Sequence, residues 1–508
     1  MKKLLQSIFS RTTFMILMVI LEVIVISFVF HWFHDLAGWI DIVLRVMSVL
    51  IILIIINHSR HLSSDLLWIV LIFLFPIPGT LIYLFLGADL ISSRTFRSLK
   101  STTEESEKYF LQDKAVEKDF DTAPGAIRGQ FRYLSESSNF PFYRNKSIDY
   151  YPLGDIGYPV MLEEMRKAKK FIFLEYFIVE EGKMWDGMVD ILKAKAKEGL
   201  DVRVLYDDLG SLRTLPSAYA STLEKEGIQC VPFNRINPII GIIANHRDHR
   251  KIMVIDGETA FSGGVNLADE YINVKVIHGH WKDNIIRIKG EAVWSYTVMF
   301  LTHWNALRQT DDDFTKFRVA VPEEAEFDGW ICPYGDTPLD NELTGQSVYL
   351  NMINHSSKYL YVMTPYLIID SDMTNMLILA AKRGVDVRII TPGIPDKKVI
   401  WDITRSYYPP LMEAGVKIFE YTPGFVHSKV FISDDREATV GTINLDYRSL
   451  YLHFENGTYL YRVSTIEKIR DDFLETNKQC RRVTGRDIKS NILKELVIEV
   501  LRIFAPQM

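Results

Sequence analysis

Two stretches of the chain carry the same five residue types at the same spacing, and these types can do chemistry. The first stretch holds His249, Lys251, Asp256, Gly263 and Asn266. The second stretch holds His427, Lys429, Asp434, Gly441 and Asn444. In both, the order is H-x-K, four residues, D, six residues, G, two residues, N. A spaced pattern of this length that recurs indicates two copies of one functional element.

These residue types suit the transfer of a phosphoryl group. The apolar runs IMVI and VFI after the lysines predict strands, where residues i and i+2 face one side, so each histidine shares a pocket with its lysine. A neutral imidazole can attack phosphorus to form a covalent intermediate, and lysine stabilises the negative charge that accumulates. Glycine permits close backbone approach, and asparagine donates to phosphate oxygens. We expect each aspartate to hold backbone in the turn after its strand.

The reaction needs both copies of the pattern. One histidine has to be neutral to attack, while the other has to be protonated to donate to the leaving alkoxide. Each copy holds one histidine, so we expect the two copies to meet face to face at one site. Because each histidine is paired with a lysine, whose ammonium repels a cation, we expect no catalytic metal and no cofactor.

Two carboxylates downstream of the histidines are candidates to orient the rings. Asp283 follows His249 in the stretch HWKDN, and Glu455 follows His427 in the stretch LHFENG. A carboxylate bonded to the far imidazole nitrogen fixes the tautomer and stabilises the imidazolium. We therefore expect Asp283 and Glu455 to complete the site, each with the histidine upstream of it.

The surrounding sequence is also repeated. KEGLDVRVL at 197–205 recurs as KRGVDVRII at 382–390, in the same order relative to the histidine stretches. Short β-branched runs alternate with helical patterns, which is typical of an α/β domain with a buried sheet. A repeat of this length indicates a duplicated domain. We expect two tandem α/β halves at 125–325 and 326–508, preceded by a charged linker at 98–124.

The first 97 residues are predicted to form a membrane anchor. Three apolar stretches, 13–33, 36–56 and 66–86, follow one another, and a spanning helix needs about 20 such residues. The basic residues before the first stretch and after the third both favour the cytoplasm. Three full spans cannot satisfy both ends, whereas a re-entrant third stretch, interrupted by Pro76 and Pro78, can. The sequence thus predicts a multi-pass protein of the cell membrane with two or three transmembrane helices and a cytoplasmic catalytic body.

Composition argues against other classes. The net charge of −6 supplies no basic field for a nucleic acid. The three cysteines are scattered, with no metal-ligand spacing and no disulfide framework. At the C-terminus, residues 491–504 have apolar side chains at helical spacing, which predicts an amphipathic helix that docks on the core or on a bilayer surface.

The paired motifs resemble the signature of the phospholipase D superfamily. The stretches 245–271, 280–293 and 423–457, with PIPGTLIYLFLG at 76–87, are similar to one branch of it, the bacterial cardiolipin synthases. The resemblance implies two phospholipase D-like α/β sandwich halves in one catalytic body. It also implies that two phosphatidylglycerol molecules give cardiolipin and glycerol through a phosphatidyl-histidine, with phosphatidylglycerol and other anionic membrane lipids as partners. By analogy with other members, His249 is the nucleophile and His427 the acid, although nothing in the sequence distinguishes them.

Three alternatives use the same motifs. A phospholipase D-type hydrolase would replace the acceptor alcohol by water, and spacing does not reveal the acceptor. A nuclease of the superfamily needs a basic face, which the composition lacks. A protein that keeps the fold without catalysis would be expected to have lost some motif residues, and both copies are intact.

Overall fold

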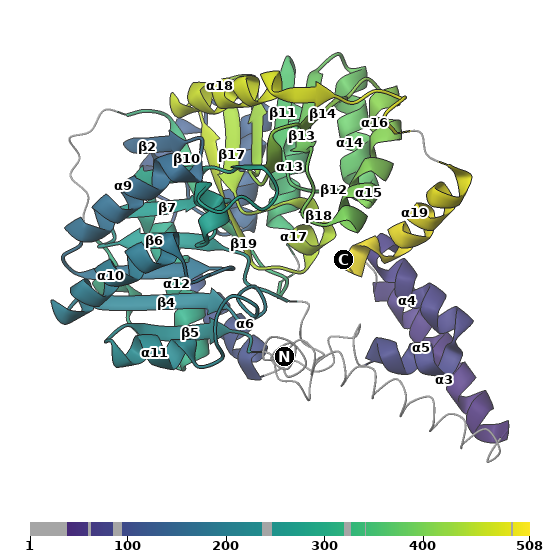
Figure 1. Ribbon diagram of the computed structural model, residues 1–508, viewed down its shortest axis with the longest axis horizontal. Coiled ribbons are helices and arrows are strands. Elements are labelled where there is room, and N and C mark those ends of the chain that lie inside the picture. Colours follow the sequence, from purple (N-terminus) through teal and green to yellow (C-terminus); the bar gives the residue numbers. More distant parts are fainter. Residues whose placement is uncertain are drawn as a thin grey trace.

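Two β-sheets with flanking helices form the body of the protein (Figure 1). The computed structural model describes residues 38–58, 62–84, 94–235, 246–319, 327–340, 342–488 and 491–507. The first predicted apolar stretch, residues 13–33, lies outside these residues.

The first half is built on a seven-stranded sheet. Its strands are β2 (Ser147–Tyr151), β3 (Phe171–Tyr176), β4 (Asp201–Asp207), β5 (Gln229–Phe233), β6 (Lys251–Ile255), β7 (Thr259–Gly263) and β9 (Ile285–Lys289). They lie in the order β2-β9-β7-β6-β3-β4-β5. Its other elements are α9 (Gly154–Lys167), α10 (Lys183–Lys197), α11 (Tyr219–Lys225), η5 (Asp269–Ile272), β8 (His280–Lys282), α12 (Val293–Arg308) and η6 (Phe314–Phe317).

The second half is built on a nine-stranded sheet. Its strands are β1 (Tyr143–Arg144), β10 (Trp330–Asp336), β11 (Tyr359–Met363), β13 (Asp386–Pro392), β14 (Lys417–Tyr421), β16 (Val430–Ser433), β17 (Glu437–Gly441), β19 (Glu455–Tyr461) and β20 (Cys480–Arg482). They lie in the order β1-β10-β19-β17-β16-β11-β13-β14-β20. The run β19-β17-β16-β11-β13-β14 repeats β9-β7-β6-β3-β4-β5 of the first sheet, with parallel and antiparallel pairs in the same places. The predicted pair of tandem α/β halves is confirmed.

The second half also contains helices, and strands of two or three residues that lie outside the large sheet. They are β12 (Leu367–Ile368), β15 (Gly424–Val426), β18 (Leu445–Asp446), α13 (Thr344–His355), α14 (Ser371–Lys382), α15 (Lys398–Ser406), α16 (Tyr408–Glu413), α17 (Tyr447–Tyr451), α18 (Thr465–Lys478), α19 (Ile492–Phe504) and η7 (Ala505–Gln507).

The halves share one apolar core. It joins the inner faces of both sheets to α12, which is buried from Val293 to Ala306, and to α18 through Ile469 and Phe473. Burial on this scale is the main stabilising contribution. Because the same side chains complete both sheets, the halves have a fixed relative position.

The segment predicted to be a charged linker is helical. It contains α6 (Arg94–Ser106), η2 (Glu107–Tyr109) and α7 (Lys114–Asp119), and α8 (Gly125–Arg132) and η3 (Tyr133–Ser137) follow. Phe96 and Leu99 of α6 are buried in the shared core, against α12. Val116 of α7 and Phe120, which follows the helix, lie in the core of the second half. The segment therefore packs against both halves.

Before this segment lie α3 (Gly38–His58), α4 (Leu62–Leu74) and α5 (Pro76–Ile82). The third predicted apolar stretch is broken between α4 and α5, because Pro76 starts a new helix. Ile55, Trp68 and Ile72 pack α3 against α4. Within the described residues, the structure contains no helix with both the length and the apolar character needed to cross a bilayer.

The motif glycines lie where a strand of each sheet approaches its neighbour. A Cβ on Gly263 would lie 2.3 Å from the carbonyl oxygen of Asn284, and the φ of Gly263 is 141°. A Cβ on Gly441 would lie 2.4 Å from the carbonyl oxygen of Asn456. These contacts agree with the predicted close backbone approach.

We predict that Gly263→Ala and Gly441→Ala each lower the free energy of unfolding by about 1–3 kcal/mol, because the added methyl group meets backbone. Gly129→Ala is the matched control, since no atom lies within 4 Å of its added Cβ. In α8 it should leave stability unchanged or raise it by up to about 1 kcal/mol. Urea titration of the detergent-purified protein measures all three, and equal stability of the three variants would contradict the prediction.

Candidate active site

Each motif histidine is held by a carboxylate from the opposite half. His249 lies two residues before β6, and its Nδ1 lies 2.8 and 2.9 Å from the two carboxylate oxygens of Glu455 in β19. His427 lies just after β15, and its Nδ1 lies 2.6 Å from Oδ2 of Asp283. Both expected carboxylates thus contact a histidine, but each pairs with the histidine of the other copy and not with the one upstream of it.

The exchange follows from backbone pairing between the halves. The amide of His249 donates to the carbonyl of Phe454, and the amide of Phe454 donates to Arg247, both at 2.9 Å. In the same way β15 pairs in parallel with β8, and the amide of His427 donates to Lys282 at 2.8 Å. The residue after each pairing partner is the carboxylate. The segment that contains each histidine therefore lies beside the carboxylate of the other half.

Both lysines point toward their histidines, as the strand spacing predicts. The Nζ of Lys251 donates to the carbonyl of His249 at 2.7 Å, and the Nζ of Lys429 donates to the carbonyl of His427. Burial lowers the pKa of Lys251 to about 8 and that of Lys429 to about 7. The nearby carboxylates of Glu455 and Asp283 oppose this shift. The lysine charges are therefore available to an anionic group near neutral pH.

The histidines are buried and neutral at neutral pH. Burial, followed by the charge of Lys251, lowers the pKa of His249 well below its ordinary value. Burial and Lys429 lower the pKa of His427 to about 4, although Asp283 acts in the opposite direction. Burial also raises the pKa of Glu455, which Lys251 opposes. With its proton on Nδ1 and donated to the carboxylate, each ring presents an unprotonated Nε2.

Both rings line one cavity of about 610 Å³ between the halves. Aromatic side chains form much of its wall: Phe177 lies edge-on to His249, and Tyr271 and Trp281 lie beside His427. A cavity of this size that is lined by two imidazoles, each with a buried lysine behind it, can hold a phosphodiester.

Comparison with known proteins identifies the family. Residues 161–304 and 349–476, which include both histidines, match the family model "Cardiolipin synthase, PLD-like domain". The chain belongs to the cardiolipin synthase family. Residues 46–87 also match the phospholipase D-nuclease N-terminal family, and this match indicates association of family members with membranes.

Relatives match over most of their length. Proteins named cardiolipin synthase from Halalkalibacterium halodurans and Geobacillus sp. are 33% and 31% identical, covering 89% and 98% of this chain and 90% and 99% of theirs. A Streptococcus mutans protein described as uncharacterized is 45% identical over 90% of this chain and 99% of its own. The solved structure of phosphatidylserine synthase from Haemophilus influenzae has the same fold, with a TM-score of 0.55 at 17% identity, covering 75% of this chain and 98% of that one.

The motif aspartates hold backbone, at the end of the strand away from the cavity. Asp256 accepts the N–H groups of residues 169–171 at 2.7–2.9 Å. Asp434 accepts those of residues 357–359 at 2.8–2.9 Å. Both aspartates have a φ of 55° and stand in the turn, as expected from the sequence. Neither aspartate lines the cavity, and neither do the buried Lys251 and Lys429, so of the six predicted catalytic residues only the two histidines line it.

The motif asparagines both line the cavity. Asn266 accepts from the amide of Ile178 at 3.1 Å, and it donates to the hydroxyl of Tyr271 at 2.7 Å. Asn444 bonds to the carboxyl group of Asp446. These bonds orient the amides, and through Tyr271 they also fix an aromatic wall of the site.

Sequence reasoning missed two groups at this site. His453 lines the cavity beside His249, with ring centroids 5.7 Å apart. Arg247 also lines the cavity, and its guanidinium donates to the buried carboxylate of Asp207 at 2.9–3.0 Å. The signal for Arg247 was its place two residues before His249 in the alternation of Arg247, His249 and Lys251. No spacing pointed to His453.

Two clusters bring three possible metal ligands within 4.8 Å in the described part of the chain. One contains His249, His453 and Glu455, and the other contains Glu175, Asp248 and His303. Lys251 stands beside the first, and Arg250 forms an ion pair with Glu175 in the second. A cation in either cluster would meet a fixed positive charge.

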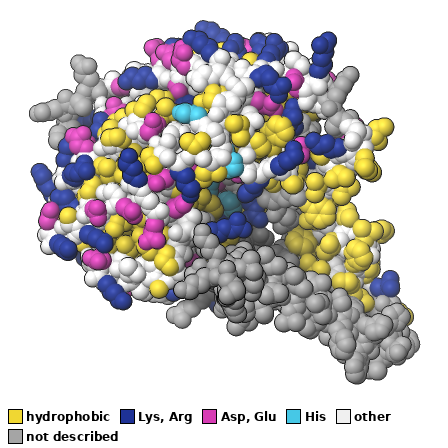
Figure 2. Space-filling model, in the orientation of Figure 1, with side chains coloured by type: hydrophobic (Ala, Val, Ile, Leu, Met, Phe, Trp, Pro, Cys, Tyr) yellow, Lys and Arg dark blue, Asp and Glu magenta, His cyan; other side chains and the backbone are white. Residues whose placement is uncertain are grey.

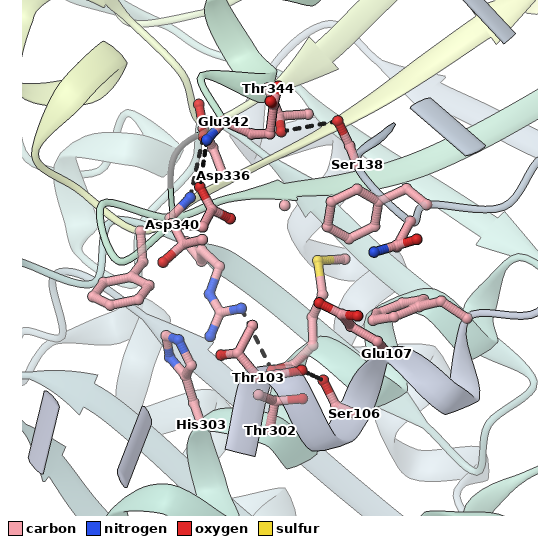
Figure 3. A pocket seen from close by; sticks show the side chains of 18 of the residues that line it. Thr103, Ser106, Glu107, Ser138, Thr302, His303, Asp336, Asp340, Glu342 and Thr344 are labelled. Carbon is pink, nitrogen blue, oxygen red and sulfur yellow. Dashed lines mark hydrogen bonds between the residues drawn. The ribbon is translucent and has the colours of Figure 1, made fainter. Parts of the chain in front are cut away.

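A second cavity has a volume of about 200 Å³ (Figure 3). It is lined by Phe454, whose carbonyl accepts the His249 amide, and by Arg250, the residue after His249. Asp336 and Asp340 lie on one side of it and His303 on the other. This cavity contains neither motif histidine.

We predict that Glu455→Gln and Asp283→Asn each reduce activity by about 10²–10⁴-fold, because the amide no longer fixes the tautomer of the ring in the opposite half. Asp336→Asn is the matched control: burial raises the pKa of this carboxyl well above its ordinary value, and it contacts neither motif histidine. Rates on lipid vesicles measure the effect, with unfolding curves to confirm folding. Activity within about twofold of the control would contradict the assigned role.

Proposed function

We propose that this protein is a cardiolipin synthase that transfers a phosphatidyl group from one phosphatidylglycerol to another, releasing glycerol. The observation that carries the proposal is the pair of motif histidines in one cavity, each bonded through Nδ1 to a carboxylate of the other half. Family membership supports it, since relatives covered over most of their length are named cardiolipin synthase.

In the first step the Nε2 of His249 attacks the phosphorus of phosphatidylglycerol. The P–N bond forms and the bond from phosphorus to the headgroup glycerol oxygen breaks. His427 donates its proton to the departing alkoxide, and glycerol leaves. Glu455 stabilises the His249 ring as it gains positive charge, and Lys251 and Lys429 stabilise the phosphoryl oxygens.

In the second step His427 acts as a base. A free hydroxyl on the headgroup of a second phosphatidylglycerol gives its proton to His427 and attacks phosphorus. The P–N bond breaks, cardiolipin forms, and His249 is neutral again. His427 is neutral in the substrate-free protein, because its pKa is about 4. The negative charge of the bound phosphodiester raises this pKa, so substrate binding supplies the acid for the first step.

The remaining site residues support these two. Asn266 and Asn444 line the cavity and contribute amide donors toward phosphate. Asp256 and Asp434 act at a distance, by fixing the backbone at the far end of the histidine-bearing strands. We assign no step to a metal or a cofactor.

The same proposal places the protein in the cell membrane. Residues 1–97 form a multi-pass anchor of two or three transmembrane helices, and residues 98–124 connect it to halves at 125–325 and 326–508. The basic residues at 94, 97 and 100 support a cytoplasmic catalytic body. An anchor suits an enzyme whose donor, acceptor and product all stay in the bilayer.

Products formed from phosphatidylglycerol labelled in its acyl chains test the function. The purified full chain in vesicles should convert the label to cardiolipin and release glycerol. The His249→Ala protein is the control for contaminating activity. Phosphatidic acid as the main product would identify a hydrolase instead, and no conversion under conditions that support a known cardiolipin synthase would contradict catalysis.

We predict that trapping of the phosphatidyl adduct distinguishes the roles of the two histidines. His249→Ala should form no phosphatidyl adduct, because the attacking nitrogen is gone. His427→Ala should form one on His249 about 10²–10⁴-fold more slowly, because only the proton donor is lost. Mass spectrometry of acid-quenched protein detects the adduct. An adduct on His427 in the His249→Ala protein, with none in the other variant, would reverse the roles.

We predict different pH dependences for kcat/KM and kcat. In the free protein the pKa of His427 is about 4, so the protonated fraction of this ring decreases as pH rises above that value. Because the first step needs protonated His427, kcat/KM should decrease as pH rises from about 5 to 8. In the complex the phosphodiester raises this pKa, so kcat should begin to decrease at higher pH. Rates in a neutral detergent avoid surface-charge effects. A kcat/KM that rises over this range would contradict a protonated His427 in the first step.

A further inference from the structure

The C-terminal helix α19 has three separate faces. Successive residues of an α-helix are about 100° apart, since a turn contains 3.6 residues. Glu495, Glu499 and Arg502 form a polar face, and Lys494 and Leu501 form a second face. The third face, about 140° wide, is wholly apolar; its members are Ile492, Leu493, Leu496, Val497, Val500, Ile503 and Phe504. The predicted amphipathic helix is confirmed, although Leu501 lies on the second face and not with the other predicted apolar side chains.

The second face docks α19 on the catalytic body. The Nζ of Lys494 lies 2.8 Å from the carboxylate of Asp402 in α15, and Leu501 packs on the core of the second half. Arg502, at the edge of the polar face, stacks its guanidinium 4.6 Å from the ring centre of Tyr407. Docking on the core, one of the two expected arrangements, therefore uses one narrow face only. The side chains of the apolar face remain exposed.

The seven residues of the apolar face are all exposed, Ile492 to 85%. Helix α19 contacts α4, and most exposed side chains of α3, α4 and the turn after α4 are also apolar, with Phe73 exposed to 76%. Figure 2 shows hydrophobic side chains covering the side of the molecule where α19 and α4 lie. The apolar face thus continues the surface of the region matched by the N-terminal membrane-associated family.

A second exposed apolar group lies at the cavity. We call it the apolar rim; it consists of Val274, Val276, Ile277, Ile394 and Val399. Val276, exposed to 73%, stands in a loop that Asn273 closes by accepting from the amide of Trp281 at 2.8 Å. Trp281 lines the catalytic cavity.

The rim connects this loop to α15. Ile394 lies next to the loop, since a Cβ on Gly279 would be 3.0 Å from its Cδ1. Val399 lies in the first turn of α15, next to Ile400, which lines the cavity. Helix α15 is also the helix on which α19 docks. Exposed apolar side chains thus stand on the loop before Trp281 and on α15, and α15 contacts α19, which contacts α4.

We propose that the apolar face of α19 and the apolar rim both lie in the interface of the lipid bilayer, so that the catalytic cavity opens toward the lipid headgroups. Exposed apolar surface of this extent marks a contact, and an interfacial helix buries its apolar face about 5–10 Å into the headgroup boundary. The inference holds whichever headgroup the enzyme transfers.

The side-chain charges of α19 indicate that apolar contact, and not electrostatic attraction, holds the helix to the bilayer. Helix α19 has two basic and two acidic side chains, and three of these four already form ion pairs or a ring contact on the protein. Electrostatic attraction to anionic lipid is therefore small. Binding of this face should not depend on the fraction of anionic lipid in the vesicle.

Site-specific fluorescence tests the proposal in the full chain. Cysteine is introduced at Val500 or Val276 and labelled with a nitrobenzoxadiazole, with Glu495→Cys and Lys275→Cys as matched controls. Cys230 and Cys332 are buried, and Cys480, which is half-buried, is replaced by serine. In phosphatidylcholine vesicles, with or without phosphatidylglycerol, probes at Val500 and Val276 should be quenched by nitroxide lipids and protected from aqueous iodide. The control probes should show the reverse.

Each other outcome overturns part of the inference. Quenching of the Val500 probe by iodide as strongly as its control would place the face in water. Protection from both quenchers would mean that protein, including a second copy of the chain, covers it. A Val276 probe in water with a Val500 probe in lipid would remove the rim from the bilayer. None of these results depends on catalysis, so they are distinguishable from failure of the proposed function.

Catalysis supplies an independent readout. The Leu496→Asp, Val500→Asp double variant should lower kcat/KM on vesicles at least about tenfold, because two buried aliphatic side chains are lost from the interface. Its activity on dihexanoyl phosphatidylglycerol dissolved as monomers should be unchanged, since no interface is needed. An equal loss on both substrates, or no loss on vesicles, would overturn the proposal.

Discussion

The pairing of each histidine-bearing segment with the opposite half is the constraint on which the site depends. His249 and Phe454 are joined through the backbone, as are His427 and Lys282, and each pairing places a carboxylate on the ring of the other half. A half alone would therefore contain a histidine without its carboxylate. The shared core around α12 maintains the pairing, because it fills the space between both sheets. The duplication is thus required for two reasons: it supplies the second histidine, and it supplies the carboxylate that orients each ring.

Burial of this pairing determines the electrostatics. Removing the rings and lysines from water disfavours their charged forms, which explains neutral histidines and a lysine with a pKa of about 7. Such a site is adapted to an anionic guest: a phosphodiester restores the charge on the lysines and on His427 together. The aromatic walls formed by Phe177, Tyr271 and Trp281 keep the reaction away from bulk water.

The exterior is arranged around the same cavity. The apolar rim stands on the loop before cavity-lining Trp281 and next to cavity-lining Ile400, and α15 links that rim to α19 and so to the N-terminal helices. A lipid whose phosphate reaches the histidines while its chains stay in the bilayer needs apolar surface beside the mouth. Anchor, rim and C-terminal helix would then act as one platform, and this arrangement accounts for exposed side chains such as Val276 that serve no purpose in the fold.

The sequence by itself determined the chemistry and the duplication. Strand alternation placed Lys251 beside His249, and the turn after the strand placed Asp256 on backbone, because both are local properties with fixed periods. The amphipathic pattern of α19 was visible for the same reason. Only the tertiary structure decided that Glu455 belongs to His249 and Asp283 to His427, since backbone pairing between distant segments has no local signal. It also decided that His453 and Arg247 reach the cavity, and that Leu501 of α19 faces the core while its apolar neighbours face outward. These placements depend on how two whole halves meet, and packing between them has no period that a single sequence can reveal.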